Sequence, residues 1–166
     1  MRKTKKLALM SVLAAIALGI FALEAQLPSI VPVPGVKLGL ANIITLTTMM
    51  LLGRKEAGAV FLVRVILGAM FAGSPSTLIF SFAGGLLAYG IMCALIGVFD
   101  EGHIWIVSAL AAIGHNAGQL LACVLVVKTP GVFAYAPILV ISGIITGIFT
   151  GFAAMYLVRA LKKLRL

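Results

Sequence analysis

The chain has 166 residues, of which 63% are hydrophobic and 10% are charged, and its mean hydropathy is +1.23. Soluble domains carry about 25% charged residues, so this chain lacks the polar side chains to cover its own surface in water. The composition excludes a soluble globular protein and predicts an all-α integral membrane protein. At about 20 residues per spanning helix, residues 1–166 form one transmembrane domain, a six-transmembrane-helix bundle with no second soluble domain.

The formal net charge of +9 lies beside apolar segments and not in a soluble segment where basic and aromatic residues alternate. This placement excludes nucleic acid as a partner and indicates contact with the lipid bilayer. Basic clusters that flank membrane segments fix topology and meet anionic headgroups. The clusters at the two ends consist of Arg2, Lys3, Lys5, Lys6, Arg159, Lys162, Lys163 and Arg165.

The first apolar run, residues 7–23, follows the basic head. It is long for a signal peptide and further apolar runs follow, so we expect a retained helix. Small residues repeat along it at every fourth position: Ser11, Ala15 and Gly19. Such a stripe lets another helix approach closely, either inside the bundle or on a partner subunit. Similar stripes occur within residues 114–122 and 143–151, and the pattern leaves open which stripe faces outward.

Residues 24–42 read EAQLPSIVPVPGVKLGLAN and contain Pro28, Pro32, Pro34 and Gly35. Proline lacks a backbone donor and glycine permits positive φ, so this stretch is not one continuous helix. We interpret it as a structured cap over a pocket just inside one membrane face. The alternative is a stiff connector outside the membrane.

The remaining predicted helices cover residues 36–52, 57–72, 77–99, 104–127 and 137–158, with a turn at residues 53–56. Six crossings place both termini on one side of the membrane. That side would also hold Arg54 and Lys55, whereas the opposite side would hold only Lys37 and Lys128. The asymmetry predicts that both termini are cytoplasmic and that the protein is a multi-pass protein of the bacterial plasma membrane.

A small set of polar residues lies within or beside the predicted spans, where charge is costly and usually functional. His115 and Gln119 share one helix face, with Asn116 beside them. These residues either line a polar cavity or join helices by hydrogen bonds. Arg64 pairs with Glu24 or with a ligand anion. The candidate substrate-binding residues are Glu24, Lys37, Asn42, Arg64, His115, Asn116 and Gln119.

Several chemistries lack the residues that they need. No GxxxxGK[ST] phosphate-binding loop occurs, and no second His or Cys lies at metal-ligand spacing from His115. With four acidic residues, the chain cannot supply the clustered carboxylates that hold Mg²⁺ on a diphosphate. We therefore expect no enzyme activity, no cofactor and no metal. A passive channel is disfavoured because no repeated charged or carbonyl-rich filter is evident.

The segment PGVKLGLANI, residues 34–43, resembles a bacterial membrane family known as heptaprenyl diphosphate synthase component I or Gx transporter. The likeness extends to residues 24–28, Arg64, FSFAGGLLA at 80–88, GHNAGQLLA at 114–122 and the glycine-rich segment 143–151. That family is similar to the substrate-binding S components of energy-coupling-factor (ECF) transporters. The resemblance implies six helices, cytoplasmic termini, a pocket near the outer face capped by the first loop, and a first-helix stripe that contacts the transmembrane coupling subunit. Ser11, Ala15 and Gly19 match that stripe, with Gly19 where the family pattern has a second alanine.

Two functions follow as hypotheses. The first is an S component that captures a small, anionic molecule and depends on a transmembrane coupling subunit and two ATPases for energy. The second is a non-catalytic membrane component associated with heptaprenyl diphosphate or quinone synthesis, which holds a prenyl chain while a separate enzyme does the chemistry.

Overall fold

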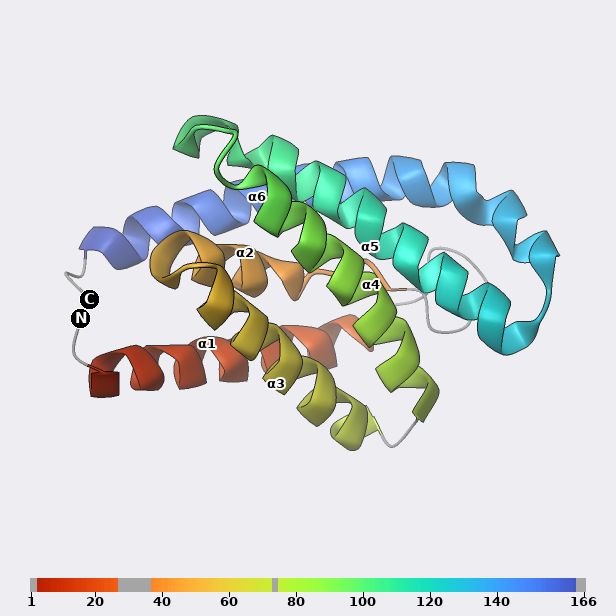
Figure 1. Ribbon diagram of the computed structural model, residues 1–166, viewed down its shortest axis with the longest axis horizontal. Coiled ribbons are helices and arrows are strands. Elements are labelled where there is room, and N and C mark those ends of the chain that lie inside the picture. The colour runs from red at the N-terminus through yellow and green to blue at the C-terminus, as the bar shows by residue number, and fades with distance from the viewer. Residues whose placement is uncertain (1–2, 27–36, 73–74, 164–166) are drawn as a thin grey trace.

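The computed structural model describes residues 3–26, 37–72 and 75–163, and these form a bundle of α-helices joined by short connections (Figure 1). The helices are α1 (Lys3–Glu24), α2 (Asn42–Leu52), α3 (Arg54–Ala72), α4 (Pro75–Leu95), α5 (Ile104–Val127) and α6 (Ala136–Lys163). Two 3₁₀ helices, η1 (Glu101–His103) and η2 (Pro130–Tyr135), lead into α5 and α6. No strand occurs in the described part of the chain, in agreement with the predicted all-α class.

In the described part of the chain, four segments are long and apolar enough to cross a membrane: Lys3–Glu24, Pro75–Leu95, Glu101–Val127 and Pro130–Lys163. The outward faces of the helices are apolar, as shown by the exposed side chains of Phe71, Leu125, Phe149 and Tyr156. In water such a surface would be unfavourable, whereas lipid solvates it. The protein is therefore a membrane protein, as its composition predicts.

α2 differs from the other helices because it is short and central. It begins at residue 42 and not at 36, and its 11 residues extend only about 16 Å, half the thickness of a hydrocarbon core. It packs against α1, α3, α4 and α6, which leaves Ile44, Leu46, Thr47 and Thr48 almost fully buried. The chain just before it, from Lys37 to Ala41, stays non-helical inside the bundle.

The other helix ends also depart from the ranges that hydropathy favours. Gly53 alone separates α2 from α3, because its φ of +107° makes the turn and Arg54 already starts the next helix. α4 ends at Leu95 and not at residue 99, and α1 and α6 extend into the basic clusters at residues 3 and 163. Lysine and arginine are good helix formers. The apolar runs of α1 and α6 therefore stop at the basic residues, whereas the helices continue through them.

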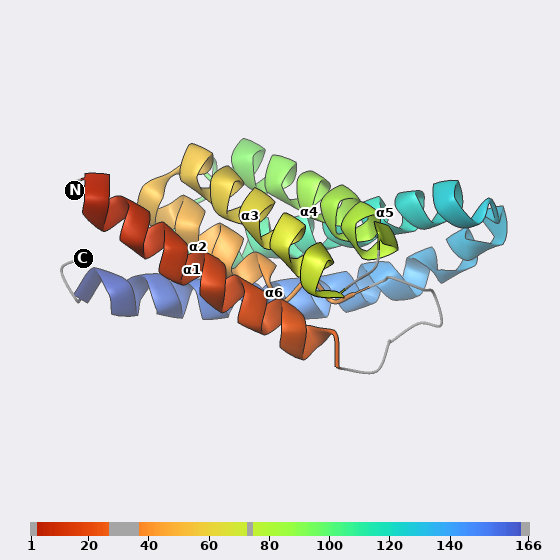
Figure 2. The same ribbon diagram turned by 90° about the horizontal axis from the view of Figure 1, so that it is seen from below.

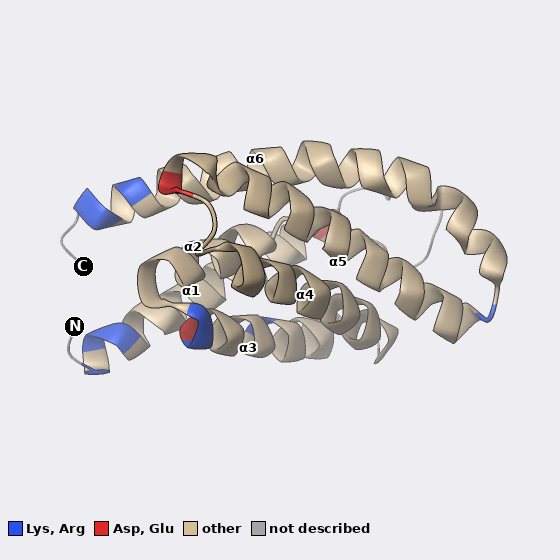
Figure 3. Cartoon of the chain, turned by 45° about the horizontal axis from the view of Figure 1, so that its top comes forward, with Lys and Arg blue, Asp and Glu red and all other residues tan. Residues whose placement is uncertain are grey.

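The start of α1 and the end of α6 lie at the same end of the bundle (Figures 1 and 2). The basic residues of α1, of the α2–α3 junction and of the end of α6 gather there (Figure 3). Among the described residues, two ion pairs join elements at this end: Lys6 with Glu56, and Lys162 with Glu101. We call it the basic end. The C-terminal end of α5, where Lys128 is the C-cap, lies at the opposite end of the bundle (Figure 1).

Candidate functional site

Glu24 ends α1 at the far side from the basic end, about 33 Å along the helix from Lys3. Its carboxylate is buried and accepts two backbone hydrogen bonds, from Gly39 N–H at 2.5 Å and from Leu40 N–H at 3.2 Å. Hydrogen bonds to a charged acceptor are worth about 1.5–3 kcal/mol each, so Glu24 fixes the non-helical segment before α2. The carboxylate thus has its own partners in the backbone.

Lys37 connects the same segment to α5. Its backbone N–H donates to Gln119 Oε1 at 3.0 Å, and its ammonium lies over the Phe21 ring, 3.7 Å from the centroid. Gln119 is almost fully buried. These contacts place Glu24, Lys37 and Gln119 in one cluster between α1, α2 and α5.

Arg64 projects from the middle of α3 and is only 3% exposed. It interacts electrostatically with Glu24, yet in the described part of the chain it forms no ion pair within 4.0 Å. Its guanidinium lies 5.7 Å from the Phe61 ring, and its Nε and Nη2 have no hydrogen-bond partner. A buried cation in this state is expensive unless an anion reaches it. The sequence left open whether Arg64 pairs with Glu24 or with a ligand anion. The structure shows no direct Glu24–Arg64 salt bridge.

His115 and Asn42 meet at Gly39. This glycine has φ +77°, and a Cβ added to it would lie 2.9 Å from His115 Cδ2 and 3.0 Å from Asn42 Nδ2. On the other side of His115, a Cβ at Gly84 of α4 would lie 3.0 Å from its Cε1. In the described part of the chain neither ring nitrogen of His115 makes a hydrogen bond of good geometry, although the Gly84 backbone is near the ring and the side chain is only 3% exposed. Two glycines therefore leave room for an imidazole with free donor and acceptor capacity.

Asn116 points away from this cluster, toward α6. Its Nδ2 donates to the Leu139 carbonyl at 2.7 Å, while its Oδ1 is buried without a partner. Asn116 also lines a cavity of about 240 Å³ between α5, η2 and α6, together with Leu120, Phe133 and Val140. The structure thus brings six of the predicted residues together and places Asn116 next to a different, mostly apolar space. We call the group of six the polar cluster; its members are Glu24, Lys37, Asn42, Arg64, His115 and Gln119.

The predicted cap cannot be compared with the structure along most of its length, because residues 27–36, with Pro28, Pro32, Pro34 and Gly35, lie outside the described residues. Its two flanks are described. They contribute Glu24 on one side, and Lys37 and Asn42 on the other, to the polar cluster.

The small-residue stripes face different ways. Ser11, Ala15 and Gly19 are all exposed on α1, and a Cβ at Gly19 would meet nothing within 4 Å. By contrast, a Cβ at Gly118 of α5 would lie 2.5 Å from the Ala83 carbonyl oxygen, and one at Gly147 of α6 would lie 2.4 Å from the Cα of Ala109. The stripes of α5 and α6 are therefore used for packing inside the bundle, and the α1 stripe stays open on its surface.

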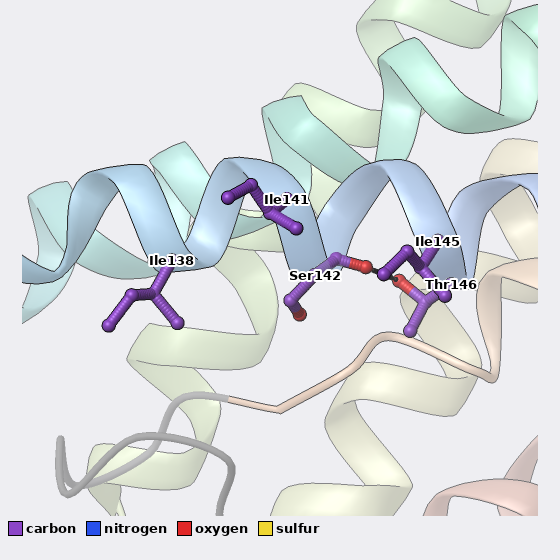
Figure 4. Close-up of a pocket in the computed structure, with 5 residues that line it drawn as sticks. All are labelled: Ile138, Ile141, Ser142, Ile145 and Thr146. Carbon is purple, nitrogen blue, oxygen red and sulfur yellow. Dashed lines mark hydrogen bonds between the residues drawn. The ribbon is translucent and has the colours of Figure 1, made fainter.

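An open, apolar hollow of about 320 Å³ lies along α6 (Figure 4). Its lining is Ile138, Ile141, Ser142, Ile145 and Thr146. The hydroxyl of Thr146 donates to the Ser142 carbonyl at 2.8 Å, within the helix, and so offers the hollow little polarity. The hydropathy of the sequence does not reveal this hollow, because every outward-facing segment has a similar composition.

Sequence reasoning also missed the residues that shape the cluster. Phe21 receives the Lys37 ammonium, and Gly39 and Gly84 make space for His115. Gly39 in GLAN and Gly84 in AGG are visible in the sequence. Their role beside His115 could not be predicted, because it depends on how helices that are distant in sequence pack together. No group of three or more His, Cys, Asp or Glu residues that could bind a metal occurs in residues 3–26, 37–72 and 75–163.

The sequence matches the family described as heptaprenyl diphosphate synthase component I. The match covers residues 13–157, which is most of the chain and includes every residue of the polar cluster. This protein belongs to that family. The membership confirms the resemblance noted from PGVKLGLANI and identifies the protein as a membrane component named for a prenyl diphosphate synthase. No curated protein and no solved structure gave a significant match.

Proposed function

We propose that this family member is the substrate-binding subunit of an ECF-type importer, which captures a small anionic molecule and has no catalytic activity of its own. The observation that carries the proposal is the contrast between the three stripes. Neighbouring helices occupy the space beside the stripe glycines of α5 and α6. The space beside the α1 stripe is open, and the exposed side chains of Val12 and Ile16 make the surface around it apolar. In lipid, a close-packing surface of this kind serves helix association.

The polar cluster supports the binding half of the proposal. It lies away from the basic end, and basic residues accumulate on the cytoplasmic side of membrane proteins. With the basic end in the cytoplasm, the cluster is in the half of the bundle nearer the outside, and both chain ends are cytoplasmic. A solute from outside would reach buried, unpaired groups of Arg64 and His115 there. Energy would come from a transmembrane coupling subunit and two ATPases docked through α1.

The test is co-purification from the native bacterial membrane in a mild detergent, with the recovered proteins identified by mass spectrometry. The wild-type protein should bring down a membrane coupling subunit and ATPases. Gly19→Leu should lose them, because the larger side chain blocks the open stripe. Gly90→Leu is the matched control: Gly90 is exposed on α4 and a Cβ there also meets nothing within 4 Å. If no ATPase is recovered, or if both variants retain it equally, the importer proposal fails.

A second candidate is a non-catalytic partner in heptaprenyl diphosphate or quinone synthesis. The family description favours it, and so does the apolar hollow on α6, which suits an isoprenoid chain. In this case the same purification should recover a soluble prenyl synthase and no ATPases. Because the two candidates predict different proteins in one experiment, the result discriminates between them.

A further inference from the structure

The guanidinium of Arg64 has a free edge of a particular kind. Its two unpartnered nitrogens, Nε and Nη2, carry the N–H bonds that run parallel along one side of the group. This edge matches the two oxygens of a carboxylate in a bidentate pair. We propose that Arg64 binds the carboxylate of a small monoanionic substrate; the inference rests on the proposed importer function and narrows its substrate class.

The other charged groups of the polar cluster are already engaged. Both oxygens of Glu24 accept backbone hydrogen bonds, and the Lys37 ammonium lies over the Phe21 ring. Among the described residues Arg64 has only the more distant Phe61 ring, and it is more deeply buried than Lys37. It is therefore the cation in this cluster that gains most from an incoming anion.

The net formal charge of the polar cluster indicates the charge of the substrate that would neutralise it. Lys37 and Arg64 are cations and Glu24 is an anion, so the cluster holds one surplus positive charge when His115 is neutral. One carboxylate neutralises it. A phosphate monoester with two negative charges would leave a net negative charge in a site that is largely closed to water, where uncompensated charge is costly.

His115 adds a requirement for hydrogen bonding. A neutral imidazole has one donor and one acceptor nitrogen, and among the described residues neither makes a hydrogen bond of good geometry. The Arg64 guanidinium and the His115 ring are close enough to interact electrostatically. The substrate is then a carboxylic acid that also carries a hydroxyl, amide or similar group for His115. A plain fatty acid would leave that nitrogen pair unsatisfied.

The experiment uses acetate as the smallest carboxylate probe. The detergent-purified, full-length protein is titrated with ¹³C-labelled acetate, and line broadening is followed by NMR; inorganic phosphate and chloride at equal ionic strength are tested as competitors. We expect saturable 1:1 binding of acetate that chloride and phosphate displace at least tenfold less well than unlabelled acetate. This comparison uses only wild-type protein, so it does not depend on whether a variant folds.

Two variants then locate the binding. Arg64→Lys keeps the charge and removes the paired donors, and it should weaken acetate binding at least tenfold. Arg54→Gln, at an exposed arginine of the same helix, should leave it unchanged. Absence of saturable binding, stronger displacement by phosphate than by acetate, or equal binding by Arg64→Lys would each overturn the inference. The importer proposal is tested separately by the co-purified ATPases, so failure of the carboxylate inference and failure of the importer proposal give different results.

Discussion

Gly118→Ala and Gly19→Ala form a matched pair that tests which small-residue stripe is buried. An added Cβ at position 118 would lie 2.5 Å from the Ala83 carbonyl oxygen and 2.9 Å from the Gly84 Cα, both backbone atoms of α4. At position 19 it would meet nothing within 4 Å. Since non-bonded heavy atoms settle at about 3.5–4.0 Å, α4 and α5 would have to separate by roughly 1 Å. Overpacking of this kind costs about 1–3 kcal/mol.

Both substitutions also replace glycine by alanine within a helix, which favours folding by about 0.5–1 kcal/mol. That gain cancels when the two variants are compared, so their difference isolates the packing cost. We expect Gly19→Ala to raise the free energy of unfolding by about 0.5–1 kcal/mol and Gly118→Ala to lower it by about 0–2.5 kcal/mol.

The assay is unfolding by SDS in mixed micelles, followed by the fluorescence of Trp105, the single tryptophan. Trp105 lies on α5 and stacks on Phe152 of α6, with ring centroids 6.2 Å apart, so its signal reports on the packing of these helices. Equal shifts for the two variants, or destabilisation by Gly19→Ala, would refute the assignment of an open stripe to α1 and a buried one to α5.

Three further predictions concern polar groups in the bundle. Asn116→Ala removes the donor to the Leu139 carbonyl and should lower the free energy of unfolding by about 0.6–1.7 kcal/mol, the range for interhelical hydrogen bonds in membranes, in the same SDS titration. Gly39→Ala should cost about 1–2 kcal/mol for positive φ alone and weaken acetate binding measured by NMR, because the new Cβ displaces the neighbouring imidazole; unchanged binding would contradict this. The Ser108 and Thr150 hydroxyls lie 2.9 Å apart and form a hydrogen bond. A double-mutant cycle with Ser108→Ala and Thr150→Val should therefore give a coupling energy of about 0.6 kcal/mol. A coupling energy of zero would show that the two hydroxyls do not stabilise each other.

Much of the polar cluster could be anticipated from the sequence because buried charge is conspicuous in an apolar chain. Glu24, Arg64 and His115 stood out for this reason, and the structure buries all three. Their partners could not be anticipated in the same way. Glu24 is bonded to the backbone before α2 and not to Arg64, and Asn116 turns to α6 although it is adjacent to His115. Pairing depends on the rotation of each helix about its axis, which sequence spacing alone does not specify.

The sequence by itself determined the membrane environment and the helical class, because hydropathy and composition do not depend on how the chain folds. It also determined the family, because motifs such as PGVKLGLANI are read from the order of the residues. It also located the basic clusters, which flank the apolar runs. Only the tertiary structure decided which glycine stripe is open, that α2 is short and buried, and that the paired nitrogens of Arg64 lack a partner. Each of these is a relation between segments far apart in the chain. Three stripes with the same four-residue spacing look alike in sequence, and only the presence or absence of a neighbouring helix distinguishes them.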